Sequence, residues 1–124
     1  IFPYRARTSP RPDMLVNLTN DGWFGRSAGP HQHLALARLR AVEQGLPLVR
    51  VANTGISAVV DALGRPSARI ELDKRGAVSL PLPTALGRTG FSLLGHAPFA
   101  IFWLLGVGFL CFWPGRNQLI SSDQ

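Results

Sequence analysis

The sequence predicts an α/β domain followed by a single transmembrane helix. Short valine-rich runs separated by turn residues occupy the first two thirds of the chain, which is typical of strands. One helical stretch, Pro30 to Gln44, lies among them, with proline at its start and Gly45 directly after its end. A charge-free apolar segment, Ala97 to Trp113, then follows. Mixed strands and helix before such a segment indicate an α/β unit tied to a membrane.

Five apolar runs are expected to form strands: 13–18, 48–52, 57–62, 68–72 and 77–82. The helix between the first two runs should begin at Pro30, since proline suits the first helical turn, and should end at Gly45. Apolar residues spaced four, three and four apart predict the stripe that the helix buries: Ala35, Leu39, Val42 and Leu46.

The apolar segment near the C-terminus has the character of a membrane span. At about 1.5 Å per residue, Ala97 to Trp113 covers about 26 Å, and the four preceding residues bring it near the ~30 Å hydrocarbon thickness. Trp113 would lie at an interface, and Arg116 beyond it favours a cytoplasmic C-terminus. A buried core helix is the alternative. We expect a transmembrane helix, because so small a chain has little interior to enclose a helix that is apolar on all faces.

Composition restricts the function further. The chain has 124 residues, a net charge of +6 and one cysteine. The basic residues are scattered arginines with a single lysine, Lys74, which argues against a nucleic-acid interface. The lone Cys111 excludes an intrachain disulfide and a multi-cysteine metal site. His31 and His33 are two residues apart, whereas a helical metal pair prefers four, so we expect no metal site.

The run Asn17 to Gly25 is the most informative part of the sequence. Short polar residues and glycines flank Trp23 and Phe24 directly after a predicted strand. Connecting loops seldom carry adjacent large aromatics, because exposed aromatic surface is poorly solvated. A loop at the carboxyl end of a strand is also the usual place for binding groups in α/β sheets.

This run resembles the Asn-Asp-x-Trp-Phe-Gly segment of bacterial apolipoprotein N-acyltransferases, which are membrane members of the nitrilase-like carbon–nitrogen hydrolase superfamily. Three later runs continue the match: 29–33, 38–43 and 53–55. The resemblance implies the C-terminal half of a nitrilase-like αββα sandwich. The expected organisation is a partial nitrilase-like domain at 1–83, a linker at 84–94, a transmembrane helix at 95–113 and a tail at 114–124.

The resemblance also implies a chemistry. The family transfers a phospholipid acyl chain to the N-terminal diacylglyceryl-cysteine of lipoproteins through a thioester on an enzyme cysteine, with a glutamate base, a lysine and no external cofactor. Its cysteine precedes a segment similar to Ile1-Phe2-Pro3, so we expect the catalytic groups upstream and this chain alone to be inactive. Cys111 lies in the apolar segment and Lys74 in a turn, which suits neither to replace them.

Two groups of site residues follow from the resemblance. The first would bind substrate or line a pocket: Asn20, Asp21, Trp23, Phe24 and Gly25. The polar members are alternatively turn formers, and the aromatics alternatively fill the core beneath the loop. The second group would support the site: Arg40, Glu43, Asn53 and Gly55. The run 53–55 is alternatively an ordinary connection between strands. Arg40 and Glu43 are three residues apart on the predicted helix, a spacing suited to an ion pair.

The partners implied are a phospholipid acyl donor, a diacylated lipoprotein acceptor and the membrane, without nucleic acid. The full-length protein would be a multi-pass enzyme of the bacterial inner membrane, with its nitrilase-like domain in the periplasm and its C-terminus in the cytoplasm. Two other interpretations remain open from the residues: a fragment of a nitrilase-like amidase and a non-catalytic, membrane-anchored binding module.

Overall fold

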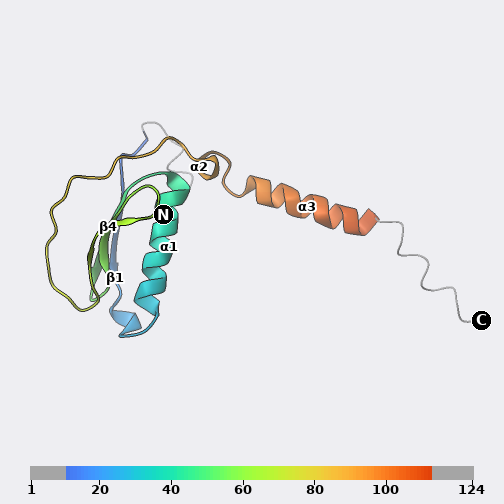
Figure 1. The fold of residues 1–124 in the computed structure, drawn as a ribbon. Coiled ribbons are helices and arrows are strands. Elements are labelled where there is room, and N and C mark those ends of the chain that lie inside the picture. Colours follow the sequence, from blue (N-terminus) through green and yellow to red (C-terminus); the bar gives the residue numbers. More distant parts are fainter. Residues whose placement is uncertain (1–10, 113–124) are drawn as a thin grey trace, which may run out of the picture. The chain divides into compact units, whose positions relative to one another are not determined.

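The computed structural model describes residues 11–112, which divide into two compact units between Leu93 and Leu94 (Figure 1). The first unit contains one four-stranded sheet in the order of its strands along the chain: β1 (Leu15–Asn20), β2 (Leu48–Asn53), β3 (Ser57–Val60) and β4 (Pro66–Ile70). β1 and β2 are parallel, and the two later pairs are antiparallel. Asn20 lies opposite Asn53 in the register, so both parallel strands end at the same edge of the sheet.

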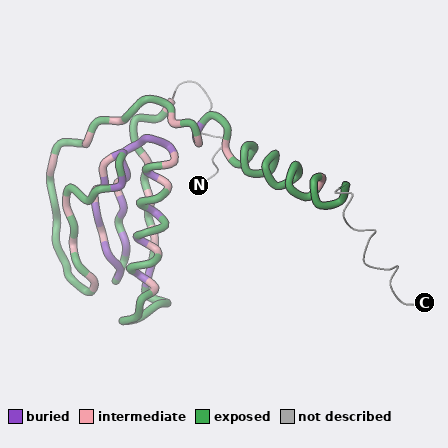
Figure 2. Tube along the Cα trace, turned by 45° about the vertical axis from the view of Figure 1, so that its right-hand side comes forward, coloured by how far each residue is buried: buried purple, intermediate pink, exposed green. Residues whose placement is uncertain are grey.

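Helix α1 (Gly29–Gln44) connects β1 to β2 and covers one face of the sheet (Figures 1 and 2). Pro30 occupies its first turn, and Gly45 ends it with φ +64°, the left-handed conformation expected of a C-terminal glycine. The core between helix and sheet consists of Leu34, Ala37, Ala41, Leu48, Ile56, Ala58 and Val60. The predicted helix is therefore confirmed, together with its stop signal.

The predicted buried stripe of this helix is wrong. The helix buries Pro30, Leu34, Ala37, Ala41 and Gln44. Of the predicted stripe only Leu46, beyond the end of the helix, is buried, whereas Leu39 is 49% exposed and Val42 is 41% exposed. The true stripe contains two alanines, whose small side chains allow the helix to approach the sheet closely. Spacing alone did not reveal it, because both faces of the helix carry apolar residues at helical intervals.

Four of the five predicted strands are present, with ends shifted by a few residues. The run 77–82 forms neither strand nor helix. Its Pro81 has no N–H to donate to a neighbouring strand, which explains why an apolar run here fails to extend the sheet.

Hydrogen bonds from Arg11 hold the segment at Leu86 and Gly87 close to the end of α1. Arg11 donates to the carbonyl oxygens of Gln44 (2.7 Å) and Gly45 (3.3 Å) at the end of α1, and also to those of Leu86 and Gly87. One guanidinium therefore joins the C-terminal end of α1 to the segment that leaves the domain, where a cation also complements the helix dipole.

The sheet face opposite α1 is apolar and open. Leu18 is 75% exposed, and Val16 and Val51 are each about half exposed. A pocket of about 260 Å³ lies across β2, β3 and β4, lined mainly by valine, alanine and isoleucine and closed by Gly76, Ala77 and Val78. An apolar face of this kind is normally covered in a folded protein.

The predicted transmembrane helix at 95–113 is wrong. Gly95, with φ +57°, separates the short helix α2 (Gly90–Leu94) from α3 (Ala97–Phe112). Sixteen residues span about 24 Å at about 1.5 Å per residue, short of the ~30 Å apolar core of a bilayer. Within residues 11–112, no helix is both long enough and apolar enough to cross a membrane. The cytoplasmic C-terminus was inferred from that helix and from Arg116, which lies outside the described residues.

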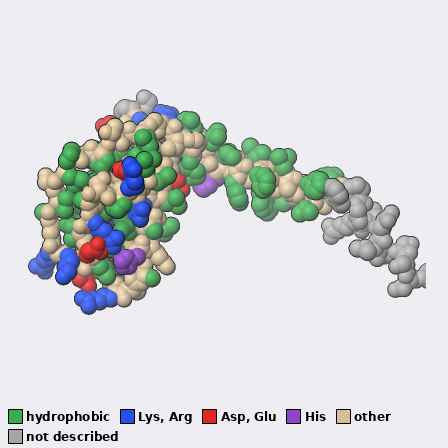
Figure 3. Space-filling view, viewed as in Figure 1, with side chains coloured by type: hydrophobic (Ala, Val, Ile, Leu, Met, Phe, Trp, Pro, Cys, Tyr) green, Lys and Arg blue, Asp and Glu red, His purple; other side chains and the backbone are tan. Residues whose placement is uncertain are grey.

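Within its own unit, α3 exposes hydrophobic side chains along its whole length, and Figure 3 shows those on the face in view. Phe102, Leu105 and Phe112 are 76%, 69% and 87% exposed. Each unit by itself therefore exposes an apolar surface of the kind that a monomeric soluble domain usually covers.

We expect the 124-residue chain alone to self-associate in water, because two apolar surfaces are uncovered. Size-exclusion chromatography with light scattering should show oligomers or aggregates that detergent disperses. Leu18→Lys should reduce association, since it places a charge on the open sheet face, on the edge strand β1. A monodisperse, detergent-free monomer of the unmodified chain would contradict this expectation.

Candidate functional site

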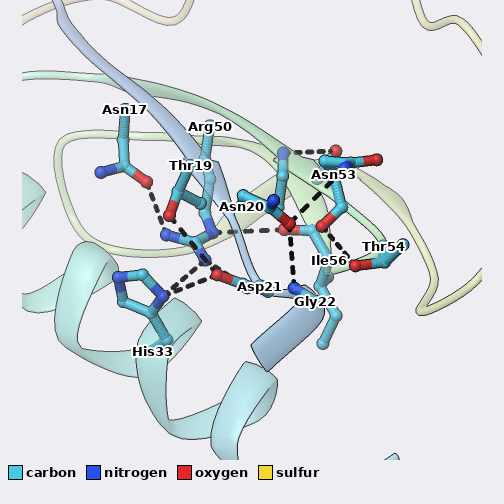
Figure 4. Close-up of polar contacts among 12 residues, drawn as sticks. Asn17, Thr19, Asn20, Asp21, Gly22, His33, Arg50, Asn53, Thr54 and Ile56 are labelled. Atoms are coloured by element: carbon cyan, nitrogen blue, oxygen red, sulfur yellow. Dashed lines mark hydrogen bonds and ion pairs between the residues drawn. The ribbon is translucent and has the colours of Figure 1, made fainter. Parts of the chain in front are cut away.

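The candidate site lies at the edge of the sheet where the parallel strands β1 and β2 end (Figure 4). The loop that follows β1 and the turn that follows β2 meet there, and the backbone N–H of Asp21 donates to the carbonyl of Asn53 (3.1 Å). The loop contains a short 3-10 helix, η2 (Gly22–Phe24). Parallel pairing thus brings together the two motifs that the sequence places 33 residues apart.

A buried ion pair lies beneath this edge. Arg50 Nη2 donates to Asp21 Oδ2 at 2.7 Å, and both side chains are fully shielded from solvent. Arg50 Nη1 also donates to Asn17 Oδ1 (2.5 Å), and Nε donates to the Ile56 carbonyl (3.3 Å). The guanidinium therefore has acceptors from β1, from the loop after it and from the residue before β3, as a buried charge requires.

His33, on the first turns of α1, is the third member of this cluster. Its Nδ1 lies 2.8 Å from Asp21 Oδ1 and 3.2 Å from Arg50 Nη2. The ring is 35% exposed, so it joins the buried pair to the surface. We define Asp21, Arg50 and His33 as the buried triad.

The loop after β1 displays its aromatics at the surface. Asn20 Oδ1 accepts a hydrogen bond from the Gly22 N–H (3.0 Å), which folds the start of the loop. Trp23 is 88% exposed, so it does not fill the core. Phe24 is 44% exposed and meets the His33 ring edge-on, with centroids 6.0 Å apart. The adjoining Gly25 has φ +54°, a conformation that suits glycine.

The turn after β2 is fitted tightly against Asp21. A Cβ at Gly55 would lie 2.4 Å from Asp21 Oδ2, so only glycine allows this approach. The preceding Thr54 has φ +56°, which is unusual for a β-branched residue. Asn53 Nδ2 points to Asn20 Oδ1 at 3.5 Å on the exposed side of the same edge. Strained backbone often accompanies functional sites, because the surrounding structure has to hold it in place.

The remaining sequence candidates lie elsewhere on the fold. Arg40 and Glu43 form an ion pair along α1 (2.5 Å), and no contact in residues 11–112 connects it with the buried triad. Cys111 is exposed on α3, in the other unit. No group of three metal-ligating side chains occurs among the described residues. The apolar pocket of the sheet shares only Arg50 with the candidate site.

Sequence reasoning missed two members of the buried triad. Arg50 was passed over as part of a valine-rich strand, although a lone charge within a buried strand is itself a sign of a buried partner. His33 was considered only as a metal ligand. Its contact with Asp21 depends on how α1 packs against β1, which residue spacing does not reveal.

Comparisons with known proteins relate most of the chain to one family. The carbon–nitrogen hydrolase family model matches residues 1–86. The chain is 52% identical over 108 residues to the apolipoprotein N-acyltransferase of Bradyrhizobium diazoefficiens, covering 86% of this chain and 20% of that protein. It is 53% identical over 102 residues to the same-named protein of Rhodopseudomonas palustris, covering 82% of this chain and 19% of that protein.

More distant bacteria give the same result. The Vibrio cholerae apolipoprotein N-acyltransferase is 40% identical over 113 residues, covering 91% of this chain and 22% of that protein. The resemblance drawn from the sequence motifs is thereby confirmed. The chain spans about a fifth of the length of these relatives.

Gly55→Ala should destabilise the fold by about 1–3 kcal/mol, because its new methyl group collides with the Asp21 carboxylate and cannot be accommodated without moving the buried triad. Thermal unfolding in detergent measures the effect. Gly87→Ala is the matched control, since a Cβ there meets nothing within 4 Å. Equal stability of the two variants would show that the turn is looser than the contacts indicate.

Breaking the buried pair from one side should cost about 3–5 kcal/mol, since it leaves an uncompensated buried charge. We expect this for Asp21→Asn and for Arg50→Met. The double variant should lose less than the sum of the two. The control is Arg69→Met, which removes one side of a more exposed ion pair with Glu71 and should change stability by at most about 1 kcal/mol. Strict additivity in this unfolding cycle would mean that the pair is not coupled.

Proposed function

The chain belongs to the carbon–nitrogen hydrolase family, and we propose on that basis that it is part of an apolipoprotein N-acyltransferase. The observation that carries the proposal is the loop after β1, whose Asn-Asp-Gly-Trp-Phe-Gly sequence lies at the edge where β1 and β2 end. Identities of 40–53% to proteins of that name, spread over most of this chain, support it.

The proposed reaction moves an acyl chain from a phospholipid to the α-amine of a diacylglyceryl-cysteine at the N-terminus of a lipoprotein. A cysteine thiolate would first attack the phospholipid ester, forming a thioester and releasing a lysophospholipid. The amine would then attack the thioester, forming an amide and releasing the cysteine thiol. Two such exchanges are each easier than direct transfer. In this proposal the catalytic cysteine, glutamate and lysine lie in the part of the enzyme upstream of this chain.

This chain would contribute one wall of the substrate pocket. Trp23 exposes an indole that suits contact with an acyl chain, and the adjacent Phe24 lies edge-on against His33. Asn20 and Asn53 offer amide groups at the same edge for the polar part of a substrate. Gly25 and Gly55 would allow the loop and the turn to hold these side chains close together.

The open sheet face would be an internal surface of the complete enzyme. Its exposed Val16, Leu18 and Val51 and the adjoining apolar pocket are suited to packing against another layer. In the proposed enzyme, the upstream half of the αββα sandwich supplies that layer. We place the enzyme in the bacterial inner membrane with this domain in the periplasm, where its lipid and lipoprotein substrates would meet.

The test uses the protein expressed from the whole reading frame, purified in detergent and supplied with phospholipid and a diacylated lipopeptide. We expect acyl transfer to the peptide amine, abolished when the upstream cysteine is changed to Ala. Hydrolysis of small amides without acyl transfer would instead favour the nitrilase-like amidase. Absence of both activities would favour a binding module.

Trp23→Ala in the same protein should lower acyl transfer by about tenfold, since removing a buried aromatic contact with an acyl chain costs on the order of 1–3 kcal/mol. Leu36→Ala is the control: it truncates an apolar side chain on α1 that is 59% exposed, outside the proposed pocket. Initial rates at several phospholipid concentrations measure the effect. Full activity of Trp23→Ala would remove Trp23 from the pocket.

A further inference from the structure

The imidazole of His33 is held at one nitrogen and open at the other. Figure 4 shows Nδ1 turned towards Asp21 and Arg50, with the opposite side of the ring turned away from both. In the described part of the chain, Nε2 has no hydrogen-bond partner, and the ring is 35% exposed. A side chain needed only to fill space would not require two polar contacts to hold its Nδ1 in place.

The contacts of Nδ1 define which nitrogen carries the proton. A carboxylate only accepts hydrogen bonds, so the 2.8 Å contact with Asp21 Oδ1 requires a proton on Nδ1. The contact with Arg50 Nη2 is longer, 3.2 Å, so we assign the Nδ1 proton to the shorter contact with Asp21. The neutral ring then carries its lone pair on Nε2.

We propose that His33 is a substrate-binding residue whose Nε2 accepts a hydrogen bond from the α-amine of the acyl acceptor. This inference rests on the proposed function and adds a residue and a role to it. An oriented lone pair suits an N–H donor and repels the oxygens of a phosphate, which only accept. The site would therefore favour an amine over a phosphate group.

The location of His33 agrees with this role. Phe24, from the loop that presents Trp23, lies edge-on against the His33 ring. An amine bound at Nε2 would thus lie beside the aromatic part of the proposed pocket, as a lipid-modified N-terminus requires. Asp21 and Arg50, both without solvent contact, would keep the ring from turning when the substrate binds.

Two substitutions of His33, His33→Asn and His33→Gln, test the roles of its two ring nitrogens separately. Asn at position 33 places its amide N–H near the position of Nδ1 and keeps the contact with Asp21, but has nothing at Nε2. Gln reaches the position of Nε2 with its carbonyl oxygen, which is also an acceptor. His31→Asn is the matched control, because His31 is two residues earlier on the same helix, is exposed and has no part in the triad.

The experiment measures the two half-reactions of the full-length enzyme separately: thioester formation from phospholipid, and transfer from the preformed thioester to a diacylated lipopeptide. His33→Asn should form the thioester as the unmodified enzyme does, and should transfer about tenfold more slowly at low lipopeptide concentration, as expected for one lost hydrogen bond. His33→Gln should recover most of the transfer rate, and His31→Asn should retain all of it.

Wild-type transfer by His33→Asn would overturn the proposal, and so would an equal slowing of both half-reactions, which indicates a structural role. These results differ from a failure of the proposed function itself, in which the unmodified enzyme would form no thioester from phospholipid.

Discussion

The arrangement of the sheet edge depends on one requirement, the complete burial of the Arg50 guanidinium. A buried cation without a partner costs several kcal/mol, so its donors have to meet acceptors wherever the chain can bring them. Here the acceptors come from Asn17 on β1, Asp21 in the following loop and the carbonyl of Ile56. Each lies on a different segment, and meeting all three fixes how β1, the loop and the β2–β3 turn lie relative to one another.

Asp21 transmits this constraint to the surface. One carboxylate oxygen binds Arg50 and the other contacts His33, while Gly55 leaves no space on the remaining side. The backbone of Asp21 also begins the turn of η2, from which Trp23 projects. The exposed Trp23 is therefore attached to a loop whose start is fixed by buried contacts. A loop that is already ordered can bind a ligand without the entropic cost of becoming ordered.

The sequence contains the local features of this fold but few of its long-range ones. Pro30 and Gly45 mark the ends of α1, because capping depends on residues next to each other in the chain. The buried face of α1 depends on how the helix packs on the sheet, so the spacing of apolar residues predicts it wrongly. The partners of Arg50 depend on packing too, and residue spacing does not reveal them. The prediction of a membrane helix was wrong for a local reason that composition does not reveal. The left-handed backbone at Gly95 interrupts an otherwise continuous apolar run and shortens the helix.

The adjacent residues Asn20 and Asp21 show how one motif serves two purposes. Side chains alternate along β1, so the last strand residue, Asn20, faces out beside Asn53, and the next residue turns inward to Arg50. An amide outside and a carboxylate inside cannot be exchanged, because only the carboxylate balances the buried guanidinium. In the proposed enzyme, Asp21 would therefore act on a substrate only through what it holds, His33 and the aromatic loop, whereas the exposed Asn20 could touch a substrate directly.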